Sequence, residues 1–241
     1  MKKQILFLSL ILGAVFLFTL SINAHANPEH YSIYKYFDGL TKSALKGNGK
    51  ALSILKKKAM TGNGFAESSV GYYYYKKNNN QKAIFWIKKS AKQGNYAGEN
   101  NLGAFYFRGL PGFTKNYKKA ISLYKKSAMQ GYNYAEYALG FAYLNGKGVP
   151  VMYNHARYWF EKASQNGFKI ADANLAVMYI NGSGVPKNYK KAFYYAKKSG
   201  IYKICYETAT LYIMMKYFIV ESAAKPKAAY ECRGLSNKIK Y

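Results

Sequence analysis

The sequence predicts an all-α protein built as a solenoid of helical hairpins, and three observations support this fold class. A segment of the form Ala-x-x-aromatic/aliphatic-x-x-Lys occurs five times, and in its first four copies a glycine follows eleven positions after the alanine. A fixed period of 32 to 37 residues is typical of repeats that bury their apolar faces only by stacking on their neighbours. The five copies begin at Ala51, Ala83, Ala120, Ala156 and Ala192.

The first 26 residues have the features of a secretory signal peptide. Lys2 and Lys3 precede an apolar stretch over residues 5–20, which the small-x-small sequence Ala24-His25-Ala26 follows. That stretch is shorter than the roughly 20 apolar residues of a spanning helix, and later segments of spanning length contain charges. We therefore expect cleavage after Ala26, no transmembrane anchor in the mature chain, and a periplasmic or secreted protein. Residues 27–44 are expected to cap the repeats at their N-terminal end.

Each repeat is expected to contain two helices, and the first helix has a pattern of its own. A small residue, a Leu or Val, and a Tyr recur at its first, fifth and ninth positions, which places them on one helical stripe. At the sixth position, glycine in three of the four copies removes a Cβ where the second helix should approach closely. The four copies of this pattern begin at Ala66, Gly98, Ala135 and Ala171.

An acidic residue occupies the second position of every one of these first helices. Four such carboxylates invite a catalytic interpretation, but the helix macrodipole also favours acids in a first turn. We interpret them as first-turn residues of this structural kind. The four residues are Glu67, Glu99, Glu136 and Asp172.

The connections between the two helices of a repeat contain turn signals. Asn145–Pro150 and Asn181–Pro186 each contain Gly-x-Gly and end in proline, which predicts left-handed turns and a stop to the preceding helix. These tripeptides follow no strand and lack the full glycine spacing of a phosphate-binding loop. Asn116 and Asn188 are expected to be the N-caps of second helices.

In this order, the motifs resemble the Sel-1-like repeat, a relative of the tetratricopeptide repeat. The resemblance covers residues 45–213 and leaves residues 214–241 as a C-terminal helical cap or tail. The chain departs from the family pattern at Asn116 and Asn188, where Asp is usual. The clearest copy consists of Leu139-Gly140, Tyr143, Gly146-Lys147-Gly148-Val149, Ala156, Trp159, Lys162, Ala163 and Gly167.

The resemblance implies a right-handed α/α superhelix, with first helices lining a concave face and second helices forming the outer face. Members are typically adaptors outside catalysis, such as host-interaction factors, envelope assembly factors or inhibitors of secreted toxins. We therefore expect a scaffold for protein–protein interaction. On the first helices, the third, seventh and tenth positions point away from the packing stripe. The residues expected to contact the partner on the concave face are Tyr72, Asn100, Tyr137 and Phe141.

The chain is strongly basic, with a formal net charge of +27 and 37 Lys and Arg residues. Only Arg108, Arg157 and Arg233 are arginine, whose planar fork is the usual choice for reading phosphate. Nucleic acid is therefore not an expected partner. The lysines lie mainly on the predicted second helices, where they favour contact with an anionic envelope surface. The alternative is a solvated face that keeps the protein soluble.

An enzyme, such as a β-lactamase or a cell-wall-acting hydrolase of the secreted Sel-1-like group, is the alternative function. The Ser-x-x-Lys element of serine β-lactamases occurs five times, a frequency that chance explains in a lysine-rich chain, and its supporting elements are absent. The mature chain has two histidines, His30 and His155, so no metal site is predicted, and no cofactor either. The five pairs are Ser32/Lys35, Ser43/Lys46, Ser53/Lys56, Ser122/Lys125 and Ser222/Lys225.

The chain has two cysteines, Cys205 and Cys232, both near its C-terminal end. In an oxidising compartment they are candidates for a disulfide, which would add about 3 kcal/mol in the chain-entropy model. The alternative is two separate thiols.

Overall fold

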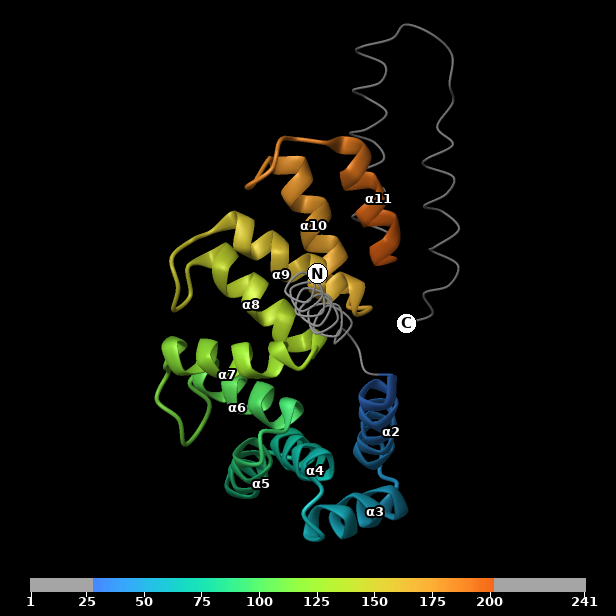
Figure 1. Cartoon of the computed structure of the whole chain (residues 1–241). Helices are drawn as coiled ribbons and strands as arrows, with labels where there is room; N and C mark the ends of the chain where they lie inside the picture. Colours follow the sequence, from blue (N-terminus) through green and yellow to red (C-terminus); the bar gives the residue numbers. More distant parts are fainter. Residues whose placement is uncertain (1–27, 202–241) are drawn as a thin grey trace, which may run out of the picture. The chain divides into compact units, whose positions relative to one another are not determined.

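The computed structural model describes residues 28–201, which are entirely helical apart from turns and loops (Figure 1). The predicted all-α class is therefore confirmed, and no strand occurs in this part of the chain. No helix in it is both long and apolar enough to cross a bilayer. The helices are α2 (Pro28–Leu45), α3 (Gly49–Met60), α4 (Gly64–Lys76), α5 (Asn80–Lys92), α6 (Tyr96–Arg108), α7 (Tyr117–Met129), α8 (Asn133–Asn145), α9 (Tyr153–Gln165), α10 (Lys169–Asn181) and α11 (Tyr189–Ser199).

The chain divides into two compact units. Of the described residues, unit 1 takes in 28–115 and 126–131, and unit 2 takes in 116–125 and 132–201. Within unit 1, α4 is the first helix and α5 the second helix of a hairpin. Within unit 2, α8 pairs with α9 and α10 pairs with α11. The predicted signal peptide, the tail over residues 214–241 and the candidate disulfide between Cys205 and Cys232 lie outside the described residues.

In unit 1, α2 packs against both α3 and α4. Phe37 of α2 is buried in one apolar cluster with Leu55 of α3 and Val70 of α4. Residues 28–45 thus form a helix that precedes α3 and packs on it, as the first helix of a hairpin packs on the second. These residues nevertheless lack the Leu-Gly-x-x-Tyr motif.

In unit 2, the predicted stripe of the first helices forms the core. Ala135, Leu139 and Tyr143 of α8 are buried, and α10 repeats this with Ala171, Leu175 and Tyr179. Phe160 of α9 is fully buried against them. The residues that recur with this period in the sequence are therefore buried residues of α8 and α10, and the predicted stripe is confirmed in these two helices.

The sixth position of the first helix is where the two helices of a hairpin approach most closely, as predicted. A Cβ added to Gly71 would lie 2.5 Å from Ile87 Cγ1, and one added to Gly140 would lie 2.6 Å from Phe160 Cδ1. In the α10–α11 hairpin, Ala176 takes the glycine position and Ala196 takes the position of Phe160, both buried. The methyl group that Ala176 adds on the first helix is thus compensated by a smaller residue, Ala196, on the second helix.

The predicted helix ends are also confirmed. Asn188 Oδ1 accepts a hydrogen bond from the backbone N–H of Lys191 at 2.9 Å, and Asn116 Oδ1 accepts one from Lys119 at 2.9 Å. Gly146 and Gly182 end α8 and α10 in the left-handed conformation, with φ of 64° and 75°. These residues fix where each helix begins and ends, and with it the register of its side chains.

The close approach at Gly140 makes a prediction about stability. Gly140→Ala should lower the free energy of unfolding by about 1 kcal/mol, because overpacking against Phe160 outweighs the helix propensity that alanine gains. Urea denaturation measures the change. Gly49→Ala is the matched control, since a Cβ at that helical glycine meets no atom within 4 Å, and it should be neutral or stabilising. A Gly140→Ala variant as stable as the control would contradict the close approach.

Candidate partner-binding surface

The four acids of the first helices lie in the first turn, as predicted, but they are also buried. A buried carboxylate is costly unless hydrogen bonds or an ion pair satisfy it. In each hairpin the second helix supplies such a partner from its C-terminal part or from the residue just after it. Since the partner comes from the far end of the second helix, the two helices of each hairpin run antiparallel.

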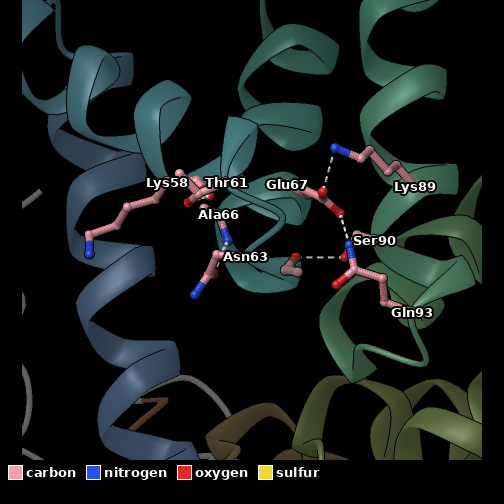
Figure 2. Close-up of polar contacts among 9 residues, drawn as sticks. Lys58, Thr61, Asn63, Ala66, Glu67, Lys89, Ser90 and Gln93 are labelled. Carbon is pink, nitrogen blue, oxygen red and sulfur yellow. Dashed lines mark hydrogen bonds and ion pairs between the residues drawn. The ribbon is translucent and has the colours of Figure 1, made fainter.

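Figure 2 shows this arrangement in the α4–α5 hairpin. Gln93 Nε2 donates to Glu67 Oε2 at 2.7 Å, and Lys89 Nζ forms an ion pair with Glu67 Oε1 at 2.9 Å. Beside them, Ser90 Oγ donates to the backbone carbonyl of Gly64 at 2.7 Å. Two side chains one helical turn apart, Lys89 on α5 and Gln93 just after α5, therefore hold one carboxylate of α4.

The other hairpins repeat this contact with small changes. Gln130 Nε2 donates to Glu99 Oε2 at 3.0 Å in unit 1, and Asn166 Nδ2 lies 2.9 Å from both carboxylate oxygens of Glu136 in unit 2. We call this recurring contact the acid clasp. In the α10–α11 hairpin, Asp172 Oδ1 pairs with Lys198 Nζ of α11 at 3.2 Å, and it also accepts a hydrogen bond at 2.6 Å from Ser164 Oγ of α9, in the preceding hairpin.

Burial has a direct electrostatic consequence in two of these clasps. Removal from water raises the pKa of Glu136 to about 7, against the opposing effects of the Asn166 hydrogen bond and the Lys162 charge. Burial likewise raises the pKa of Glu99, opposed by the charge of Lys126. The partners named for these two acids belong to the second helix of the same hairpin or follow it directly, so the contact joins the two helices.

The predicted contact residues of unit 1 lie on the first helices. Tyr72 of α4 is 36% exposed, and Asn100 of α6 is half-buried. The ring of Tyr72 lies under Lys76 Nζ, 5.5 Å from its centroid. Partner contact by these residues remains a prediction.

The two predicted contact residues of unit 2, Tyr137 and Phe141, differ in their exposure to solvent. Phe141 is 38% exposed, whereas Tyr137 is half-buried because its ring packs 4.9 Å from that of Phe168 and 5.7 Å from that of Phe160. Tyr137 therefore packs beneath the exposed surface of α8, and the side chain of Phe141 lies on that surface.

Equivalent positions of α8 and α10 carry a set of exposed apolar side chains, of which Phe141 alone was a predicted contact. We call the set the unit 2 apolar strip; it consists of Tyr134, Phe141, Ile170 and Val177, all exposed. Tyr134 is seated against α10, since its ring lies 4.8 Å from that of Phe168, the residue that caps α10. The signal in the sequence was the spacing of 36 residues between members of each pair, Tyr134 with Ile170 and Phe141 with Val177.

Basic residues are distributed very unequally between the two kinds of helix. Among the second helices, α3, α5, α7 and α11 carry four lysines each, whereas α9 carries one lysine and one arginine. In α4, α6, α8 and α10 the basic residues are Lys76, Arg108 and Lys169, each at a helix end. An overall excess of lysine affects both kinds of helix alike, so it does not account for this division. The first helices present an uncharged, apolar surface and the second helices a basic one.

The serines of the Ser-x-x-Lys pairs that the structure describes lie at or near the surface. Ser32, Ser53 and Ser122 are exposed on α2, α3 and α7, and Ser43 is half-buried. A serine nucleophile needs an activating base and a site that excludes water, and exposed helical faces do not provide one. Within residues 28–201, His, Cys, Asp and Glu residues form no group of three or more that could hold a metal ion.

Repeated helical hairpins with a first-turn acid, a close approach and an exposed first-helix surface define a helical repeat scaffold. The model of the Sel1 repeat matches residues 66–95, 97–132, 133–168 and 170–200, more than half of the chain. The chain belongs to the Sel1 repeat family, as its resemblance to that repeat predicted. Repeats of this family generally mediate protein–protein interactions.

Solved structures support this assignment. A protective antigen from uropathogenic Escherichia coli with an SLR fold is 25% identical, with a TM-score of 0.66 over 85% of this chain. The match spans 46% of that antigen, so this chain covers less than half of its length. A Sel1 repeat protein from Oxalobacter formigenes is 26% identical, with a TM-score of 0.65 over 83% of each chain. A search of curated protein sequences gives no significant match.

The acid clasp of Glu136 predicts a pH dependence of stability. Below pH 4.5 the carboxyl is protonated in both the folded and the unfolded chain. Between pH 4.5 and about 7 the unfolded chain loses this proton first, so stability falls as pH rises, by about 3 kcal/mol in total, and then levels off. Glu136→Gln should remove this contribution, which urea denaturation at a series of pH values measures as a widening difference from the wild type.

The control for that experiment is Glu161→Gln, which changes a partly exposed acid of the same unit that pairs with Arg157 at the surface. Its stability should stay parallel to that of the wild type over this pH range. If the stabilities of Glu136→Gln and the wild type changed with pH in parallel, this would contradict the raised pKa of Glu136.

Proposed function

We propose that this protein is an exported scaffold that binds a partner protein through the exposed apolar residues of its first helices. The observation that carries the proposal is the composition of those exposed positions. In a chain where lysine is the abundant surface residue, the unit 2 apolar strip holds Tyr, Phe, Ile and Val. Aromatic and aliphatic side chains without charge are the composition of the buried core of a protein interface.

The structure of the strip supports the same proposal. Phe141 and Val177 occupy the same position of consecutive first helices, and Tyr137 and Phe168 pack beneath the strip. A rigid base keeps exposed side chains in place, which lowers the entropy lost when a partner binds. An adaptor, an inhibitor of a secreted toxin and a host-interaction factor are the roles that such a scaffold fits.

Export is part of the proposal, and residues 1–26 support it. We expect the chain, expressed with its own N-terminus in a bacterial host, to appear outside the cytoplasm with Asn27 as its first residue. Cell fractionation and N-terminal sequencing measure both. A cytoplasmic chain that retains Met1 would contradict export.

Partner binding is tested by capture. Phe141→Ser combined with Val177→Ser should reduce by at least about tenfold the amount of partner captured from envelope and culture extracts, because interface anchors each contribute more than 1 kcal/mol. Quantitative mass spectrometry of the captured proteins measures the change. Tyr158→Ser is the matched control, since Tyr158 is at least as exposed as Phe141 and Val177 but lies on a second helix.

The control variant should capture the same partner as the wild type. Equal capture by the strip variant and the wild type, with both variants folded by circular dichroism, would contradict the assignment of the strip as the binding surface.

A further inference from the structure

The second helices also expose large apolar side chains, and these occupy one repeated position. The residue two positions after the repeat alanine is Phe85 in α5, Tyr158 in α9 and Tyr194 in α11, with exposed fractions of 59%, 50% and 60%. These rings lie on the side of each hairpin that carries the lysines, away from the uncharged surface of the first helices.

Each of the three rings is held in place by the next residue along the chain. Phe85 packs edge-to-face on Trp86, Tyr158 on Trp159 and Tyr194 on Tyr195, with 5.1 Å between ring centroids in every pair. The supporting rings are half-buried, and Trp159 and Tyr195 border the core of unit 2. The exposed rings are therefore ordered before any ligand arrives.

Lysines surround two of these rings, Phe85 and Tyr194, whereas Tyr158 has Asn154, His155, Glu161 and Lys162 at the corresponding places. Residues three and four positions before and after Tyr194 share its helical face, and all four are lysines: Lys190, Lys191, Lys197 and Lys198. Lys198 is tied to Asp172, while Lys190 and Lys197 are exposed. Phe85 has Lys82, Lys88 and Lys89 in three of the same four places.

We propose that the aromatic-lysine patches of α5 and α11 each bind the surface of an anionic lipid bilayer. Lysines attract the phosphates of anionic headgroups, and an aromatic ring at their centre enters the interface between headgroups and acyl chains, where aromatic side chains are favoured. A soluble polyanion is matched by charge alone and makes no use of a ring among the lysines, and the core of a protein interface is depleted of lysine. The combination of an exposed ring with lysines on the same helical face is the reason to assign a bilayer.

The patch is separate from the surface proposed to bind a partner protein, because it lies on the second helices. Either surface can therefore fail its test without affecting the other. A chain bound to a bilayer through its second helices would keep its first helices available to a partner.

The test uses the mature chain and vesicles of phosphatidylcholine with or without phosphatidylglycerol, measured by co-sedimentation. The wild type should bind only vesicles that contain phosphatidylglycerol, and more weakly as salt increases. Lys190→Gln with Lys197→Gln should weaken binding roughly 30-fold at low salt, from the attraction expected per lysine near an anionic surface. Tyr194→Ser should weaken it roughly tenfold with no change in charge, because apolar surface is no longer buried.

Two controls separate a bilayer from other anions. Phe141→Ser with Val177→Ser, on the first helices, should bind vesicles as the wild type does. The tyrosine variant should retain wild-type binding to dextran sulfate, a soluble polyanion. Wild-type binding of vesicles by the tyrosine variant, or no binding of phosphatidylglycerol vesicles at low salt, would overturn the proposal.

Trp86 provides a second measurement, because it supports Phe85 on α5. In a Trp159→Phe variant, whose only tryptophan is Trp86, phosphatidylglycerol with brominated acyl chains should quench the fluorescence when the protein binds. Binding without quenching would place α5 away from the acyl chains and would also overturn the proposal.

Discussion

A buried carboxylate near the start of each first helix is the interaction on which the rest of the structure depends. Such a group must be satisfied, and its partner comes from the second helix of the same hairpin, as with Gln93 for Glu67 and Asn166 for Glu136. This requirement fixes how far one helix can slide along the other. The close approach at Gly71 or Gly140 then fixes how near they lie. Together they determine which side of each helix is exposed.

The exposed sides that result have different chemistry. The first helices expose apolar residues such as Phe141 and Val177, and the second helices expose lysines with aromatic rings such as Tyr194 among them. Because every hairpin has the same register, each kind of residue recurs at the same place from repeat to repeat. A repeat protein obtains a large surface in this way from a small set of positions.

Much of this fold could be predicted from the sequence, because periodicity reports burial directly. The stripe of Ala135, Leu139 and Tyr143 and the caps at Asn116 and Asn188 follow from local rules. The acid clasps could not be predicted in this way, since their partners lie about 30 residues away and depend on how two helices pair. The half-burial of Tyr137 was missed for the same reason, because Phe168, which covers it, belongs to the start of the next repeat.

The acid clasp is tested most directly by a double-mutant cycle between Glu136 and Asn166. The free energy of unfolding is measured at pH 8 for the wild type, Glu136→Ala, Asn166→Ala and the double variant. A hydrogen bond to a charged group predicts a coupling energy of at least about 1 kcal/mol between the two residues. Additive effects of the two substitutions, within about 0.5 kcal/mol, would show that the second helix does not hold the acid of the first.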